Sequence, residues 1–282
     1  MKTATPLVSV IVTTRNNTET LSACLSSITA QTYPAIELIV VDNNSTDDTK
    51  AIAARYTKHV FNKGPERSVQ RNFAVQKAQG EYVCIIDSDM ELADAVIASC
   101  VETAQQHPEA EAIIIPEESF GVGFWAQCKR LERSFYVGQD AIEAARFFTK
   151  HVYQQVGGYN EAMVGGEDWD LSQRIRKVTA IARSQAYIRH NEGRLNLHKA
   201  LKKRFYYTVG FVQYFQNQGA KNAGAPAASV FSYYGLFLSH PGKLLRNPAY
   251  GIGMLFMKTC EFGANALGYV SATRKLAAKE AK

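Results

Sequence analysis

Asp87 and Asp89 lie one residue apart, directly after the apolar run 82–86 (YVCII). Two carboxylates this close repel each other at neutral pH, and a divalent cation would relieve the repulsion. Their hard oxygen ligands suit Mg²⁺ or Mn²⁺, and such a cation neutralises the charge that develops on a leaving diphosphate. Because Asp-x-Asp triplets are common, the alternative is a polar strand end with two solvated acids. The position after a buried strand favours the metal site.

A second acidic group lies at 166–170 (GEDWD). Glu167 and Asp168 fall at the expected start of a helix, where acids favour the helix dipole, so the simple interpretation is capping. A carboxylate held there could instead deprotonate an attacking hydroxyl group, and composition alone does not choose between the two acids. His190 ends an expected strand. A lone histidine is usually structural, but a neutral imidazole could complete a metal shell begun by Asp89.

Cationic side chains near the same place could pair with a diphosphate. The candidates are Lys63, Arg67 and Arg71, and surface solvation is the alternative for the first two. Asp42 follows another apolar run. It could accept a hydrogen bond from a base or a ribose, or cap the helix that follows.

These residues need a scaffold, and the first hundred residues alternate between strand-like and helix-like segments. The expected strands are 8–14, 36–41 and 82–86, and the expected helices are 19–31, 46–56 and 67–78. Near-continuous Val and Ile runs separated by helices predict a parallel sheet covered on both faces. Ligands bind beyond the carboxyl ends of such strands. If the strands are neighbours, the polar residues after each of them lie along one edge.

The remaining chain predicts more elements. They are helices at 94–106, 123–136, 168–177 and 195–216, strands at 112–116, 144–152 and 181–190, a turn at 157–159, and an apolar run at 225–269 that three prolines interrupt. The fold class is therefore α/β, with a doubly wound, mostly parallel sheet and a helical, basic C-terminal appendage. We expect this α/β domain over 1–194, which the resemblance described below implies to be a nucleotide-sugar-binding catalytic domain, and a basic, aromatic helical region over 195–282.

Charge divides unevenly along the chain. Residues 194–282 carry 13 Lys/Arg against 2 Asp/Glu, whereas residues 1–193 carry 19 against 24. Lys199, Lys202, Lys203 and Arg204 precede three aromatic residues, a composition that suits an anionic membrane surface. The run 225–238 is too short to span a bilayer, which takes about 20 residues. The alternative is that these helices pack on the catalytic domain or form a homodimer.

Cysteine usage and the N-terminus bear on location. The five cysteines contain no Cys-x-x-Cys pair, which fits free thiols in a reducing cytoplasm. The run 7–12 is short and polar residues follow it, so it predicts a first strand rather than an export signal. We expect a cytoplasmic protein, with peripheral contact at the inner face of the cell membrane as the further hypothesis, and no nucleic-acid partner.

Taken together, these features resemble the inverting glycosyltransferases of family 2, which have the GT-A fold. The resemblance covers residues 6–203 and is carried by the segments PLVSVIVTTRN, LIVVDNNSTDDT, RNFAVQKAQGEYVCIIDSDM and VGGYNEAMVGGEDWDLSQRI. It implies a role for each matching position. Donor binding falls to Thr14, Asn16, Asp42, Arg71 and Asp87, metal binding to Asp89 and His190, base catalysis to Asp168, and contact with the acceptor or the donor sugar to Gly158, Glu167 and Trp169.

The resemblance implies inverting transfer of a sugar from a nucleoside-diphosphate sugar, with UDP favoured by Asp42. The segment HNEGRLNLHKALKKRFYY is similar to enzymes of prokaryotic surface polysaccharide or glycolipid biosynthesis, which implies a glycan or lipid-linked acceptor. The chain lacks the QxxRW motif of processive synthases, which favours one or few additions. One alternative is a sugar nucleotidyltransferase, but residues 13–18 lack the glycine-rich phosphate loop of that class. The other is a non-catalytic nucleotide-sugar-binding module, which would have lost one of the two acidic motifs.

Overall fold

The computed structural model describes residues 5–217 and 230–280. Residues 225–229 of the expected apolar run lie outside these ranges. The chain forms two compact units, one of residues 1–118, 143–161 and 167–191, and the other of residues 119–142, 162–166 and 192–282. The return to the second unit at 192 lies close to the expected boundary at 194. The segment 119–142 forms part of the second unit, and the expected division of function at 194 stays a prediction.

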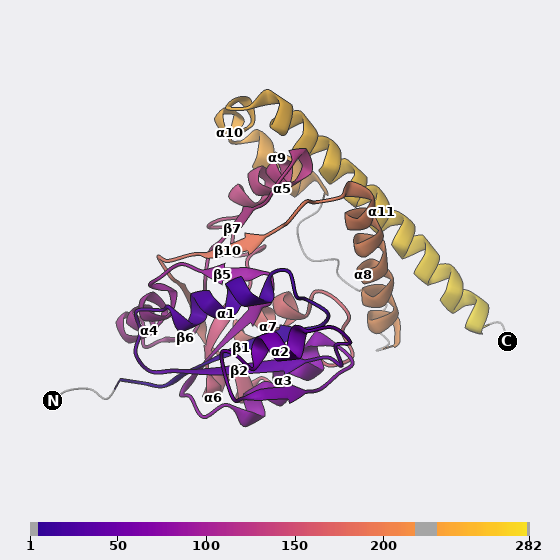
Figure 1. Ribbon diagram of the computed structural model, residues 1–282. Coiled ribbons are helices and arrows are strands. Elements are labelled where there is room, and N and C mark those ends of the chain that lie inside the picture. The colour runs from indigo at the N-terminus through magenta and orange to yellow at the C-terminus, as the bar shows by residue number, and fades with distance from the viewer. Residues whose placement is uncertain (1–4, 218–229, 281–282) are drawn as a thin grey trace. The chain divides into compact units, whose positions relative to one another are not determined.

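A seven-stranded sheet forms the centre of the first unit (Figure 1). Its strands lie in the order β3-β2-β1-β4-β8-β6-β9. They are β1 (Val8–Thr14), β2 (Ile36–Asp42), β3 (Val60–Asn62), β4 (Tyr82–Asp87), β6 (Ala110–Ile114), β8 (Ala145–Thr149) and β9 (Ala180–Arg183). Strand β8 runs antiparallel to β4 and β6, and the other pairs are parallel. The mixed α/β fold with a mostly parallel sheet is thus confirmed.

Helices cover both faces of this sheet because its strands are apolar on both sides. One core contains side chains of α1 (Leu21–Thr29) and α4 (Val96–Gln106). The opposite core contains side chains of α3 (Arg67–Lys77), α6 (Lys150–Gln155) and α7 (Glu167–Ile175). The short α2 (Thr49–Ala53) replaces the longer helix expected at 46–56.

A second sheet of three short strands has the order β5-β10-β7. These strands are β5 (Met90–Leu92), β7 (Glu117–Phe120) and β10 (Ile188–Asn191). The single strand expected at 181–190 was wrong. Its first part is β9, which pairs with β6 in the large sheet, and its last part is β10, which pairs with β5. The strand expected at 144–152 ends at Thr149, whose side chain caps α6.

The second unit is helical. Its helices are α5 (Phe124–Ser134), α8 (Leu197–Asn217), α9 (Val230–Leu238), α10 (Pro241–Leu245) and α11 (Pro248–Glu280). Four buried charges join α5 to α11: Lys129 and Lys258 each lie within 3.2 Å of both Glu132 and Glu261. Within the described residues, no helix is long and apolar enough to cross a bilayer.

Candidate functional site

The carboxyl ends of β2, β1 and β4 lie side by side, as the sequence predicted. Thr14 is paired in register with Asp42 on β2, and Thr13 is paired with Asp87 on β4. The hydroxyl groups of Thr13 and Thr14 are buried without a hydrogen-bond partner among the described residues. Buried polar atoms are normally satisfied, so this edge of the sheet has the unmet hydrogen-bonding capacity of a ligand site.

Arg71 joins the two acidic motifs. Its guanidinium is fully buried and donates to Asp87 Oδ1 at 2.7 Å and to Asp168 Oδ1 at 2.8 Å. Glu167 Oε1 lies 3.3 Å from the same group, and the ring of Tyr159 lies under it at 4.9 Å from the centroid. The motifs at 87–89 and 166–170, about eighty residues apart in sequence, therefore form one cluster.

The two acids of the second motif differ in their surroundings. Glu167 is buried and pairs with Arg67 and Arg71. Burial and the neighbouring Asp168 raise the pKa of Glu167. The side chain of Asp168 is 23% exposed, and its Oδ1 also accepts a hydrogen bond from the Tyr159 hydroxyl at 2.9 Å. Of the two, only Asp168 is accessible to an incoming hydroxyl group.

The first motif also has two different acids. Burial alone would raise the pKa of Asp87, but the guanidinium groups of Arg71, Arg146 and Arg67 outweigh burial and hold this pKa well below its usual range. Asp87 is therefore an anion whose charge is already compensated by arginines. Asp89 faces His190 instead, with 3.4 Å between Asp89 Oδ2 and His190 Nε2. The strand pairing explains this contact, because β10 lies beside β5, which begins at the residue after Asp89.

Asp89 and His190 fit a divalent cation. Asp89 Oδ1 is buried and has no hydrogen-bond partner among the described residues, which suits an oxygen whose partner is a metal ion. The described residues contain no group of three or more metal-ligating side chains. Mg²⁺ and Mn²⁺ are commonly bound by one or two protein ligands, with substrate phosphates and water completing the shell, so a two-residue site agrees with this chemistry.

Asp42 and Asn16 shape the loops at the same edge. Asp42 is fully buried and accepts hydrogen bonds from the backbone and side chain of Ser45. Asn16 has a positive φ of 45°, and its side chain accepts a hydrogen bond from the Thr46 backbone. Both residues therefore support the loop after β2. Asp42 does not cap the helix that follows, which was the alternative role, because α2 begins at Thr49 with Asp48 as its N-cap residue. Donor contact by Thr14, Asn16 and Asp42 stays a prediction.

The turn before α7 explains another candidate. Gly158 has a φ of 66°, and a β-carbon there would lie 2.8 Å from the side-chain oxygen of Asn72. Asn72 accepts hydrogen bonds from the Tyr159 backbone and the Tyr153 hydroxyl, and donates to the Tyr159 carbonyl. Gly158 thus permits the turn that places Tyr159 beneath Arg71. Trp169 is half-buried in the first turn of α7.

Sequence reasoning missed Arg146 and Glu117. Arg146 is buried on β8, donates to Glu117 Oε1 at 2.7 Å, and lies 3.5 Å from Asp87 Oδ2. The only sequence signal was an arginine inside an otherwise apolar strand, which requires a buried counterion.

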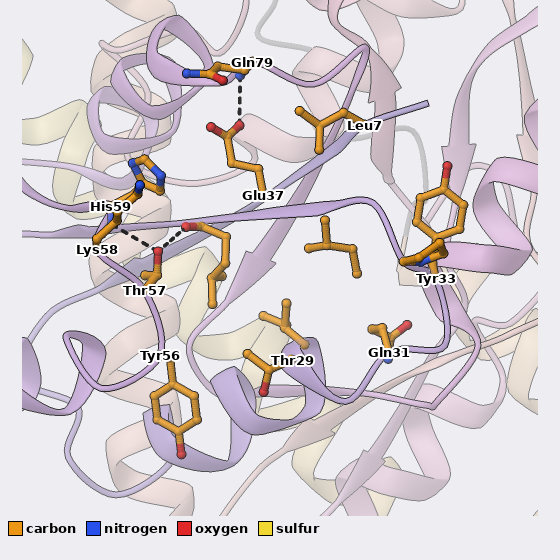
Figure 2. A pocket seen from close by; sticks show the side chains of 14 residues that line it. Leu7, Thr29, Gln31, Tyr33, Glu37, Tyr56, Thr57, Lys58, His59 and Gln79 are labelled. Atoms are coloured by element: carbon orange, nitrogen blue, oxygen red, sulfur yellow. Dashed lines mark hydrogen bonds between the residues drawn. The ribbon is translucent and has the colours of Figure 1, made fainter. Parts of the chain in front are cut away.

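A pocket of about 630 Å³ lies elsewhere in the first unit, at the opposite, amino-terminal ends of the strands (Figure 2). It contains none of the predicted site residues. Two of its polar groups already bond to their neighbours, since Glu37 accepts from the Gln79 backbone and Thr57 donates to the Leu38 carbonyl. The predicted site residues Thr14, Asp42 and Asp87 lie at the carboxyl edge instead.

Comparison with known proteins agrees with this geometry. Over 146 residues the chain is 32% identical to glycosyltransferase GlyG of Streptococcus pneumoniae, a match that covers 48% of this chain and 45% of that protein. Over 180 residues it is 26% identical to GalNAc(5)-diNAcBac-PP-undecaprenol beta-1,3-glucosyltransferase of Campylobacter jejuni, covering 57% of each chain. The chain thus spans about half the length of these relatives.

The fold has a solved counterpart in mannosyltransferase PcManGT from Pyrobaculum calidifontis, whose structure is a complex with GDP-Man and Mn²⁺. The TM-score is 0.63 at 19% identity, and the match covers 94% of this chain and 87% of that one. Residues 9–157, more than half of the chain, match the family model described as "Glycosyl transferase family 2". The chain therefore belongs to glycosyl transferase family 2 and has the GT-A fold.

Proposed function

We propose that this protein is an inverting, metal-dependent glycosyltransferase that uses a nucleoside-diphosphate sugar. The observation that carries the proposal is the single cluster in which Arg71 joins Asp87, on the donor side, to Asp168. A non-catalytic binding module has no need of a partly exposed carboxylate held in place beside its ligand site. A nucleotidyltransferase would need a glycine-rich phosphate loop after its first strand. The residues that follow β1 in this chain contain no such loop.

The donor lies, in this proposal, along the carboxyl ends of β2, β1 and β4. Asp89 and His190 would hold Mn²⁺ or Mg²⁺, which supplies charge neutralisation for the diphosphate. Thr14, Asn16, Asp42 and Arg71 remain our candidates for the base, ribose and diphosphate. A UDP-sugar is our first choice. A solved structure of TarS from S. aureus, similar in fold with a TM-score of 0.50 at 15% identity, contains UDP-GlcNAc, whereas that of PcManGT contains GDP-Man.

Asp168 is the proposed base. Among the described residues, Arg71 and Tyr159 both donate to Oδ1 of Asp168, so Oδ2 is the oxygen that would accept a proton. The acceptor hydroxyl oxygen attacks the anomeric carbon as its proton passes to Asp168, and the bond from that carbon to the diphosphate oxygen breaks. A single in-line displacement of this kind inverts the anomeric configuration. Buried Glu167, together with Arg71 and Tyr159, positions the base.

The acceptor is, we propose, a glycan or a lipid-linked sugar. Among the relatives named above, the Campylobacter protein supports this class, because its name gives an undecaprenol-linked substrate. In the second unit, a pocket of about 630 Å³ combines the rings of Phe124 and Trp125 with the cationic side chains of Arg194 and Lys199. Aromatic and cationic groups together suit a ligand that has both an apolar and an anionic part.

Peripheral contact with an anionic membrane fits the same unit. Helix α11 exposes Ile252, Phe256, Leu267 and Val270, which fall within an arc of about 60° at 3.6 residues per turn. An exposed apolar stripe with basic side chains nearby in sequence is typical of interfacial helices. We expect Arg204 to contribute less to membrane binding than its charge suggests, because Arg204 lies 3.4 Å from Glu261, which compensates that charge. A homodimer through the stripe is the competing outcome.

Two experiments test these proposals. Transfer from a panel of nucleotide sugars, measured with Mn²⁺ and with chelator, should require the metal and should be abolished by Asp168→Asn. An NMR assignment showing the product with the donor's anomeric configuration would refute the inverting mechanism.

Membrane contact is tested by flotation. Vesicles that contain anionic lipid should carry the protein upward, and the double variant Ile252→Asp/Phe256→Asp should not float, whereas the double variant Lys58→Gln/Lys177→Gln should float like wild type. Wild type that stays with the soluble fraction would refute membrane contact.

A further inference from the structure

Glu117 lies on the side of His190 that faces away from Asp89. Glu117 Oε2 is 3.4 Å from His190 Nδ1, and Asp89 Oδ2 is 3.4 Å from His190 Nε2. Both separations are long for hydrogen bonds. The small sheet explains the arrangement, because β10 lies between β5 and β7. One ring nitrogen therefore faces the proposed metal ligand and the other faces a second carboxylate.

We propose that Glu117 is a positioning residue that makes His190 a metal ligand. A neutral imidazole has one N–H group and one lone pair, and the partner of the N–H group determines which nitrogen has the lone pair. With Nδ1–H donated to Glu117, the lone pair lies on Nε2, on the side of Asp89. Metal-ligating histidines usually donate their other N–H group to such an acceptor. This inference rests on the metal site of the proposed function.

Arg146 holds Glu117 in place. Its Nε–H donates to Glu117 Oε1 at 2.7 Å, so the remaining oxygen, Oε2, is directed at His190. Arg146 also lies 3.5 Å from Asp87, and Asp87 accepts a hydrogen bond from Arg71. A continuous series of contacts thus connects the proposed base Asp168 with Asp89, in which the acids Asp87 and Glu117 lie between Arg71, Arg146 and the neutral imidazole of His190. The alternative role of Glu117 is only to neutralise buried Arg146.

Metal affinity separates these roles. Titration of the full chain with Mn²⁺ alone, followed by electron paramagnetic resonance, should show affinity weakened 10- to 100-fold by Glu117→Gln. Glu118→Gln is the matched control, because this neighbour is exposed and alternates to the other face of the strand. The double variant Glu117→Gln/His190→Gln should bind Mn²⁺ no more weakly than the single variant His190→Gln, since Glu117 acts through the histidine. Additive losses in the double variant would overturn the proposal.

The histidine tautomer gives a second readout that does not involve metal or activity. The protein has six histidines, so the ¹⁵N signals of His190 are identified by their absence in His190→Gln. In metal-free protein at pH 8 they should report Nδ1–H, and Glu117→Gln should shift them toward a mixture of tautomers. If Glu117→Gln does not fold, Glu117→Asp tests the same contact, because it withdraws the carboxylate by one methylene.

The outcomes distinguish this inference from the proposed function. If Asp89→Asn and His190→Gln leave Mn²⁺ affinity unchanged, the metal site fails and this inference fails with it. If both weaken binding but Glu117→Gln changes neither affinity nor tautomer, only the role of Glu117 is overturned.

Discussion

Replacing Arg71 by methionine removes a buried cation and keeps a side chain of similar length. Arg71 is 0% exposed and lies within 3.3 Å of three carboxylates, those of Asp87, Glu167 and Asp168. Breaking a buried ion pair from one side costs about 3–5 kcal/mol, because the partner charges stay buried without compensation. We expect Arg71→Met to lower the free energy of unfolding at pH 7 by that amount, which corresponds to roughly 6–20 °C in melting temperature.

Arg67→Met is the matched control. Arg67 precedes Arg71 by one helical turn and pairs with Glu167 at 2.9 Å, but its side chain is 40% exposed. Pairs that reach solvent contribute about 0–1 kcal/mol. Urea unfolding of both variants, followed by circular dichroism, measures the difference between them. Equal losses for Arg67→Met and Arg71→Met would refute the assignment of Arg71 as the buried centre of the cluster.

The pH dependence of this loss follows from Asp87. Its pKa is held well below the usual range by arginines, against the opposing effect of burial. A carboxyl whose pKa is lower in the folded protein stabilises the fold above its unfolded pKa of about 3.9, and the stabilisation is lost as pH falls. The difference between wild type and Arg71→Met should therefore be largest near pH 7 and should shrink as pH falls from about 5. A difference that grows in acid would contradict this explanation.

Three further predictions concern single contacts. Gly158→Ala should cost about 1–3 kcal/mol, because it adds a close approach to Asn72 to the strain of a positive φ, whereas Gly157→Ala, with φ 80° and open space, should cost less in the same urea assay. Glu132→Gln leaves two buried ammonium groups with less compensation and should cost about 3–5 kcal/mol, with exposed Glu102→Gln as the neutral control. Tyr159→Phe removes one donor to Asp168 and should lower kcat more than it raises KM for the donor; an unchanged kcat would show that this hydrogen bond does not position the base.

The sequence by itself determined the elements whose signals are local. The β-branched runs predicted β1, β2 and β4, and the helix expected at 67–78 is α3, which ends one residue earlier. Because parallel strands direct their carboxyl ends to one edge, the positions of Asp42 and Asp87 at that edge followed as well. This prediction assumed that β1, β2 and β4 are neighbours, and the strand order confirms that they are.

The partners of the buried charges depended on tertiary structure alone. Arg71 meets Asp168 across 97 positions of sequence, and Arg146 meets Glu117 across 29. Such pairs follow from strand order, from the antiparallel insertion of β8, and from the division of 181–190 between two sheets. A local pattern shows that a side chain is charged and lies on a strand. The pattern does not show which opposite charge compensates that side chain. The tertiary fold decides this, because burial makes an unpaired charge too costly and the fold places a partner within reach.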